Sequence, residues 1–169
     1  GSMHDGHNFI RDAVDQGVKN IVVEDEPIDL PEDVNCFRVP NTLKALQSVA
    51  ARHKSRFRNL TTLAITGSNG KTTVKEWLYQ MITDRRVVKN PKSYNSQTGV
   101  ALSPWQIQDD DRLGIFEAGI STRNEMAALE AMIRPDLGLF TTLGDAHAEG
   151  FRSLQEKLEE KLILFKFFL

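Results

Sequence analysis

From residue 58 onward, short apolar runs alternate with amphipathic segments, and this alternation most constrains the fold. Such an order is typical of parallel strands joined by helices through right-handed crossovers. The runs "RLGIFEAGI" and "PDLGLFTTL" are apolar almost throughout, as in strands buried on both faces of a sheet. We expect strands at 61–66, 86–89, 112–118 and 136–141, and helices at 71–82, 99–107, 123–133 and 153–166.

The part before residue 58 predicts a smaller α/β unit. We expect helices at 7–17 and 41–56 and strands at 20–24 and 36–40. Asn41 is the expected N-cap of the second helix, and the single cysteine, Cys36, is expected in a core. The basic stretch "RHKSRFRN" ends the second helix and places a domain boundary near residue 58. The predicted domains are therefore 3–57 and 58–169, with the parallel sheet and its flanking helices in the second.

Composition narrows the function classes. The chain has 169 residues, of which 40% are hydrophobic and 26% charged, which is typical of a soluble globular protein. A net charge of -2 argues against a broad nucleic-acid-binding face. Apolar runs are too short for a membrane span, so we expect a cytoplasmic protein. The sequence stops in "KLILFKFFL", within an apolar helical pattern, and we expect a fragment of a longer chain.

The stretch "TGSNGKTT", residues 66–73, is the strongest functional motif. Gly67 and Gly70 let successive backbone N–H groups converge on an anion at the start of a helix. Lys71 can reach the β- and γ-phosphates of a nucleotide, and the Thr72 hydroxyl can bind Mg²⁺. The motif departs from the general P-loop, because Ile65 stands where the first glycine would be. A glycine-rich turn that only packs is the alternative.

Two further candidates follow other strands of the predicted sheet. Glu117 ends one strand and His147 lies just past another, at the edge where the glycine-rich loop also lies. A carboxylate there is a typical Mg²⁺ ligand. The alternatives are a solvent-facing glutamate and a structural histidine.

The last predicted helix carries a lysine within an apolar stripe. Leu154, Leu158, Leu162 and Phe165 form the stripe. Lys161 projects within it, and Lys157 lies at its edge. In one interpretation the methylene chain of Lys161 packs in the stripe and its ammonium reaches water. In the other, Lys161 lies at the metal site, where it could be a ligand only as an anionic carbamate. The helix at 71–82 is expected to bury Val74, Trp77, Leu78, Met81 and Ile82 on one face.

Five segments together resemble the Mur ligases of bacterial cell-wall synthesis. They are "TGSNGKTTVKEWL", "SYNSQTGVALS", "FEAGISTRNEMAAL", "RPDLGLFTTLGDAHAEGFRSL" and "EEKLILF". Within that family they are most similar to the type that adds D-Ala-D-Ala to UDP-N-acetylmuramoyl-tripeptide. "DGHNFI" and "AVDQGVKNIVVE" resemble the end of the family's UDP-sugar-binding domain.

The resemblance implies an ATP-dependent amide ligase of the P-loop type with two Mg²⁺ ions. ATP phosphorylates the substrate carboxylate, and the incoming amine then displaces phosphate from the acyl phosphate. Catalytic roles are implied for Lys71, His147 and Lys161. Nucleotide contacts are implied for Gly67, Ser68, Asn69, Gly70, Lys71, Thr72, Thr73 and Asn95. Metal binding is implied for Thr72, Glu117, His147 and Lys161, the last as a carbamylated lysine, and UDP-sugar contacts for Asp5, Gly6 and His7.

Two positions depart from the family pattern. Ser96 replaces the second asparagine of the segment that starts with Asn95, and Ala101 replaces a proline. The alternatives are another Mur ligase, a folylpolyglutamate synthase, or a P-loop module that binds nucleotide without catalysis. Because closure of further domains is needed for catalysis, the fragment alone is expected to turn over poorly.

Overall fold

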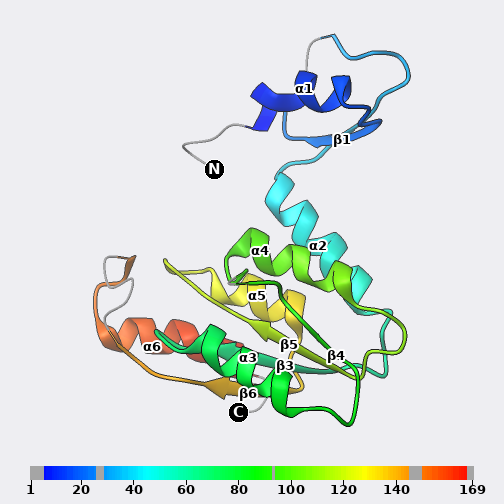
Figure 1. The fold of residues 1–169 in the computed structure, drawn as a ribbon. Coiled ribbons are helices and arrows are strands. Elements are labelled where there is room, and N and C mark those ends of the chain that lie inside the picture. Colours follow the sequence, from blue (N-terminus) through cyan, green and yellow to red (C-terminus); the bar gives the residue numbers. More distant parts are fainter. Residues whose placement is uncertain (1–5, 26–28, 93, 145–149, 167–169) are drawn as a thin grey trace. The chain divides into compact units, whose positions relative to one another are not determined.

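The structure of the chain is a computed structural model, and it describes residues 6–25, 29–92, 94–144 and 150–166. It divides into two compact units, Gly1–Ala45 and Leu46–Leu169, which are treated separately below (Figure 1). The division falls within one helix, earlier than the boundary expected near residue 58. No helix in the described part is long and apolar enough to cross a membrane.

The first unit is a small parallel pair of strands packed with a helix. It contains η1 (Gly6–Phe9), α1 (Ile10–Asp15), β1 (Asn20–Val23) and β2 (Asn35–Arg38). Its core consists of Ile21, Val23 and Val34, with Ile10, Val14 and Leu30 packed against them. The expectation that Cys36 is a core residue is wrong: every residue of β2 is exposed, because the helix covers only the alternate side chains of β1.

Helix α2 (Thr42–Lys54) begins in the first unit and ends in the second. The side chain of Asn41 accepts a hydrogen bond from the backbone N–H of Lys44 over 2.8 Å, which confirms it as the N-cap. Ala50 is fully buried, whereas Leu43 and Val49 are exposed. Ala50 belongs to the core of the larger unit, so most of this helix packs with that unit.

The second unit is built on a parallel four-stranded sheet, which confirms the predicted α/β class. The strand order is β4-β5-β3-β6, and every pair is parallel. The strands are β3 (Thr61–Thr66), β4 (Val87–Lys89), β5 (Leu113–Glu117) and β6 (Leu137–Phe140). The helices are α3 (Lys71–Met81), α4 (Gln97–Leu102), η2 (Ser103–Gln106), α5 (Met126–Ile133), α6 (Leu154–Leu162) and η4 (Ile163–Phe165).

Helices cover both faces of this sheet (Figure 1). Successive strand residues belong to different cores. Ala64 and Phe116 pack with α4 and α5 in the larger core. Ile65 and Ile115 face the other side, toward α3. Burial on both faces explains why the strands are apolar almost throughout.

The buried face of α3 differs from the prediction. Val74, Leu78 and Ile82 pack against the sheet as expected, but Trp77 and Met81 are 63% and 76% exposed. Lys75 is fully buried instead. Because Lys75 turns inward, the buried face is rotated toward it, and positions 77 and 81 lie outside that face.

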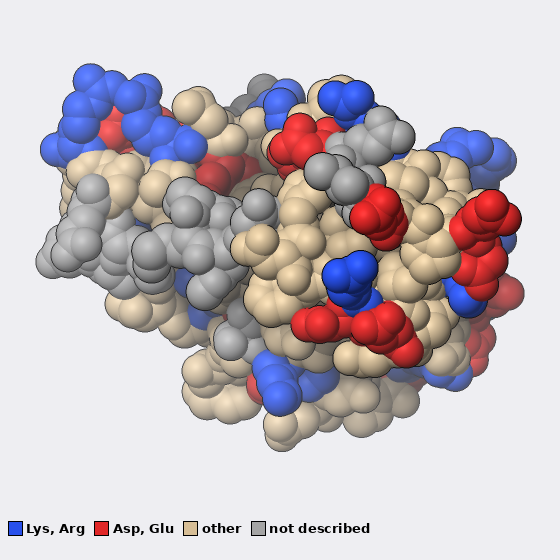
Figure 2. Space-filling view, turned by 90° about the horizontal axis from the view of Figure 1, so that it is seen from above, with Lys and Arg blue, Asp and Glu red and all other residues tan. Residues whose placement is uncertain are grey.

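Charged side chains of both signs lie on the outer surface. Figure 2 shows lysine and arginine residues and acidic residues on the same face, with uncharged surface between them. This distribution accords with the small net charge of -2.

Candidate functional site

The loop between β3 and α3 turns through two glycines in the left-handed region. Gly67 has φ of 143°, and Gly70, immediately before α3, has φ of 81°. A Cβ atom on Gly67 would lie 2.0 Å from Oγ1 of Thr141, so only glycine fits there. The loop leads into the amino end of α3, where backbone N–H groups and the helix dipole favour an anion.

Hydrogen bonds fasten this loop to the segment that follows β6. The backbone N–H of Ser68 donates to Thr142 O over 2.7 Å, and the Thr141 hydroxyl donates to Asn69 O over 2.6 Å. The Ser68 hydroxyl accepts from Gly144 N over 2.9 Å and donates to Gly144 O over 3.0 Å. Tertiary hydrogen bonds therefore hold the loop in place.

Lysine ammonium groups gather at the same loop. Lys71 and Lys161 donate to the carbonyl oxygen of Gly67 over 2.9 and 3.1 Å, and Lys157 donates to Gly144 O. Burial, with the positive charges of Lys71 and Lys157, lowers the pKa of Lys161 to about 8. Burial also lowers the pKa of Lys71. Positive charge concentrated in this way suits a polyanion such as a triphosphate.

The inner face of α6 is charged, which corrects the predicted leucine stripe. Lys157, Glu160 and Lys161 are the buried residues of this helix. In contrast, Leu154 and Leu162 are 48% and 38% exposed. Lys161 is thus buried as expected, but the face around it is charged rather than apolar. The two lysines donate to loop carbonyls, and Glu160 accepts a hydrogen bond from the backbone N–H of Met126.

Thr72 and Glu117 meet at the carboxyl edge of the sheet. The Thr72 hydroxyl donates to Oε2 of Glu117 over 2.9 Å, and the glutamate side chain is fully buried. The other carboxylate oxygen, Oε1, lies 2.9 Å from Nζ of Lys75. Two oxygen-bearing side chains therefore lie together beside the glycine-rich loop, a donor set that suits Mg²⁺ completed by water and phosphate oxygens.

Sequence reasoning missed Lys75 and Asn90. The Asn90 side chain is buried and accepts a hydrogen bond from the backbone N–H of Glu117 over 3.0 Å. Lys75 lies one helical turn after Lys71, and Asn90 directly follows β4 at the carboxyl edge of the sheet. These placements are the signals that could have identified both residues.

The Asn95 segment lies against the end of β5. The carbonyl of Asn95 accepts from Gly119 N over 2.9 Å, and a Cβ atom on Gly119 would lie 2.9 Å from Cγ of Asn95. Ser96 caps α4, because its hydroxyl accepts from Gly99 N over 3.2 Å. The departure at Ser96 thus has a structural role, whereas the buried Ala101 packs in the core.

Four further predicted site residues lie outside the described part of the second unit. Asp5 and His147 lie outside the described residues. Gly6 and His7 belong to the first unit, where His7 Nε2 accepts from Asp25 N over 3.3 Å. Thr73 is exposed on α3. Within the described ranges, no group of three or more His, Cys, Asp or Glu residues could hold a metal ion.

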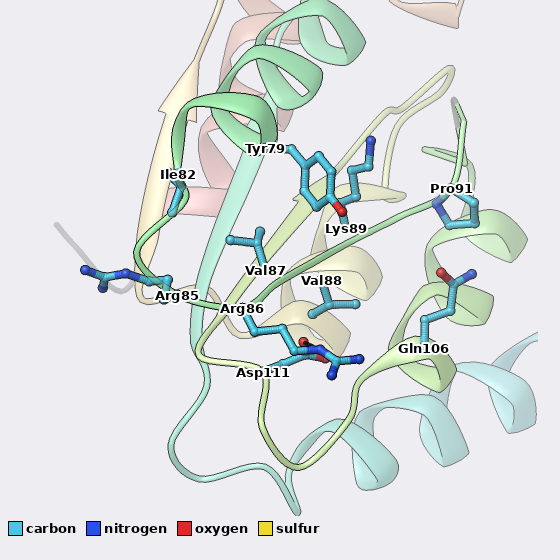
Figure 3. A pocket seen from close by; sticks show the side chains of 10 residues that line it. All are labelled: Tyr79, Ile82, Arg85, Arg86, Val87, Val88, Lys89, Pro91, Gln106 and Asp111. Carbon is cyan, nitrogen blue, oxygen red and sulfur yellow. Dashed lines mark ion pairs between the residues drawn. The ribbon is translucent and has the colours of Figure 1, made fainter.

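A pocket of about 570 Å³ lies beside the edge strand β4, away from the glycine-rich loop (Figure 3). Its lining includes Arg86 and Asp111, whose Nε and Oδ1 atoms are 3.2 Å apart, and Lys89, which pairs with Glu76. A second pocket, of about 490 Å³, lies near the ends of α2 and α5. Neither pocket includes a residue of the glycine-rich loop, and the cations named in the first are already paired.

A glycine-rich loop that joins a central parallel strand to a helix packed on the sheet defines an α/β protein of the P-loop class. Residues 65–169 match the Mur ligase middle domain, and the chain belongs to the Mur ligase family. The solved structure of MurF from Acinetobacter baumannii superimposes with a TM-score of 0.91 at 24% identity, over 98% of this chain and 36% of that one. MurF from Thermotoga maritima in complex with ADP gives 0.87 at 29% identity, over 98% and 38%.

Curated relatives carry a more specific name. The UDP-N-acetylmuramoyl-tripeptide–D-alanyl-D-alanine ligase of Treponema pallidum is 33% identical over 99% of this chain and 39% of the relative. The ligase of the same name from Rickettsia prowazekii is 32% identical over 97% and 36%. This chain thus spans little more than a third of the length of these relatives.

Proposed function

We propose that the chain is the nucleotide-binding part of an ATP-dependent amide ligase of peptidoglycan precursor synthesis. In the full-length protein this ligase joins D-Ala-D-Ala to UDP-N-acetylmuramoyl-tripeptide. The observation that carries the proposal is the meeting of Thr72 and Glu117 beside a loop lined by lysines. The names of relatives that align with nearly the whole chain support the choice of substrates.

In this proposal the glycine-rich loop holds the triphosphate of ATP. Backbone N–H groups from Gly67 to Thr72, with the amino end of α3, surround the β-phosphate, and Lys71 turns from the carbonyl of Gly67 to the phosphates. The ADP complex of the Thermotoga maritima relative supports nucleotide binding. The carbonyl bonds of the lysines would then be replaced by stronger charge-assisted bonds.

Thr72 and Glu117 are the proposed holders of the first Mg²⁺, and His147 and Lys161 of the second. Mg²⁺, when bound, neutralises charge on the phosphates. The amine of Lys161 would react with carbon dioxide, forming an N–C bond and releasing a proton, to give the anionic carbamate. Only a neutral amine does this, and a pKa lowered to about 8 leaves a usable neutral fraction.

The proposed reaction has two steps. A carboxylate oxygen of the tripeptide attacks the γ-phosphorus, the bond to the bridging oxygen breaks, and ADP leaves. The amine of D-Ala-D-Ala then attacks the acyl carbon, inorganic phosphate leaves, and the amine loses a proton. Lys71 and Lys157 would hold the transferred phosphoryl group by charge, which is the main way proteins assist such transfers.

The remaining assignments follow from the same proposal. Residues 3–57 would be part of the UDP-sugar-binding domain, with Asp5, Gly6 and His7 near the sugar nucleotide. Asn95 would lie between nucleotide and substrate. Since the substrates are a nucleotide-linked precursor and ATP, the reaction would occur in the cytoplasm.

Phosphate release from Mg-ATP by the full-length protein tests the proposal. UDP-N-acetylmuramoyl-tripeptide would be offered with D-Ala-D-Ala, and shorter muramoyl precursors or folate with single amino acids. Release only with the dipeptide supports the assignment. Release only with a single amino acid points to another Mur ligase or a folylpolyglutamate synthase. Nucleotide binding without release under any condition would leave a non-catalytic P-loop module.

A further inference from the structure

Lys75 is the most deeply buried cation beside the proposed metal site, yet the reaction above gives it no part. Its side chain is fully buried, although it extends from the second turn of α3. Its ammonium lies 2.9 Å from Oε1 of Glu117 and donates to Asn90 O over 3.0 Å and to Lys92 O. Burying a lysine without such partners costs free energy, so these contacts fix the place of the Lys75 ammonium.

The two oxygens of Glu117 face different groups, Oε1 in an ion pair without a hydrogen bond and Oε2 in a hydrogen bond. Oε1 lies against the ammonium of Lys75, and Oε2 accepts from the Thr72 hydroxyl. Asn90 holds the backbone N–H of Glu117, and the carboxylate is fully buried between its two partners. A threonine hydroxyl keeps lone pairs for a metal ion, whereas an ammonium has none. Only the Oε2 side of this carboxylate can therefore share a metal with Thr72.

We propose that Lys75 determines the ion preference of the site by restricting Glu117 to one donor oxygen. The inference rests on the proposed Mg²⁺ site and deepens it. Mg²⁺ requires near-ideal octahedral geometry and takes single carboxylate oxygens, whereas Ca²⁺ accepts six to eight ligands and often a bidentate carboxylate. Because the ammonium of Lys75 lies at Oε1, Glu117 can bind a metal ion through Oε2 alone, which is the monodentate coordination that Mg²⁺ uses. The bidentate coordination that favours Ca²⁺ is prevented. Lys75 is thus a positioning residue that acts through Glu117.

A purely structural role for Lys75 makes a different prediction. The same ammonium joins two carbonyls of the segment after β4, so its loss would also loosen that segment. Loosening of that segment alone would weaken ADP binding by a similar factor in the presence of Mg²⁺ and of Ca²⁺. A change in the ratio of the two affinities is therefore the informative readout.

The experiment is calorimetric titration of the 169-residue chain with ADP in the presence of Mg²⁺ or Ca²⁺. Lys75→Met is compared with the unchanged chain and with the control Lys54→Met, which removes a half-buried lysine that donates to Arg134 O over 3.1 Å. We expect Lys75→Met to move the preference toward Ca²⁺ by about tenfold, the lower end of the changes in metal affinity that follow loss of a partner of a metal ligand. Lys54→Met should leave the ratio unchanged. An unchanged ratio in Lys75→Met would overturn the inference.

A second measurement does not depend on a stable variant. A crystal structure of the unchanged chain with Mn²⁺ and ADP should show Glu117 bound to the metal through Oε2 alone, with Lys75 still at Oε1. A bidentate Glu117, or a displaced Lys75, would overturn the inference while leaving the proposed function intact. Failure of ADP to bind with any ion would overturn both.

Discussion

Lys71 and Lys161 donate to one shared acceptor, the carbonyl oxygen of Gly67, although they lie on different helices. Two ammonium groups at one carbonyl repel each other, and burial strengthens that repulsion. The pKa of Lys161 is lowered to about 8 by burial first and then by the charges of Lys71 and Lys157, whereas that of Lys71 is lowered by burial and by Lys157. The loop therefore gathers positive charge that a phosphate group would neutralise.

Lys161→Met should stabilise the ligand-free chain near neutral pH. Because folding lowers the pKa of Lys161 from 10.5 to about 8, burying the charged lysine costs free energy below pH 8. At about 1.4 kcal/mol per pKa unit, and with about 1 kcal/mol subtracted for the lost hydrogen bond to Gly67, the expected gain is about 2.5 kcal/mol. The gain should shrink as the pH rises from 8 toward 10.5.

Urea unfolding of both proteins on either side of this range measures the effect. A variant that is no more stable than the unchanged chain at neutral pH would contradict the prediction. Nucleotide binding in the presence of Mg²⁺ should weaken in the same variant, since methionine cannot form the proposed carbamate that holds the second Mg²⁺.

Thr72→Val should reduce the gain in ADP affinity that Mg²⁺ provides, while the ADP affinity without Mg²⁺ changes little. The valine keeps the shape of the side chain but has no oxygen for the metal. We expect ADP affinity without Mg²⁺ to stay within about twofold and the gain from Mg²⁺ to fall about tenfold. Thr83→Val, at an exposed position just after α3, is the control. Calorimetry that finds the full gain in Thr72→Val would exclude the hydroxyl as a ligand.

Lys157→Met should weaken ATP binding and reduce its dependence on salt. Lys157 donates to Gly144 O beside the loop, and its charge acts on both Lys71 and Lys161. A charge-assisted contact of this kind corresponds to about a tenfold change in affinity. Lys92→Met, which removes an exposed lysine, should change neither quantity. Competition with a fluorescent nucleotide at two salt concentrations measures the ATP affinity and its salt dependence. If the variant and the unchanged chain bind ATP equally well at low salt, Lys157 has only a structural role.

Gly67→Ala should destabilise the second unit. The added Cβ would lie 2.0 Å from the Thr141 hydroxyl oxygen, and φ of 143° is itself strained for alanine. We expect a loss of about 2–3 kcal/mol. Gly144→Ala, whose Cβ would meet its nearest neighbours at 3.9 Å, should be nearly neutral. Thermal unfolding compares the two variants, and similar melting temperatures would show that the loop adjusts easily.

Local pattern was sufficient for the secondary structure of the second unit. The expected strand at 61–66 coincides with β3, and the expected helix at 71–82 differs from α3 by one residue. The helix expected at 99–107 begins earlier, since Ser96 caps it, and ends as the short helix η2. Strand period, helix period and capping are properties of neighbouring residues, so they can be read from the chain.

Orientation within the elements was harder to predict. The leucines of α6 suggested an apolar inner face, and Trp77 and Met81 were expected to be buried. The structure buries Lys75 and Lys157 as well as Lys161, which was expected to project inward, because distant carbonyls and one carboxylate compensate these charges. A hydropathy pattern treats each side chain separately, so it cannot predict the carbonyl or carboxylate oxygen with which a buried lysine pairs in the fold.

By itself, the sequence determined the α/β class, the glycine-rich loop and the positions of Lys71, Thr72, Glu117 and Lys161. These depend on short-range periodicity and on the carboxyl ends of parallel strands lying at one edge. The tertiary structure alone decided that Thr72 and Glu117 share a hydrogen bond, and that Lys75 and Asn90 hold the glutamate. The physical reason is that a buried charge is stable only when its partner arrives from another part of the chain, and strand order and helix rotation determine which partner that is.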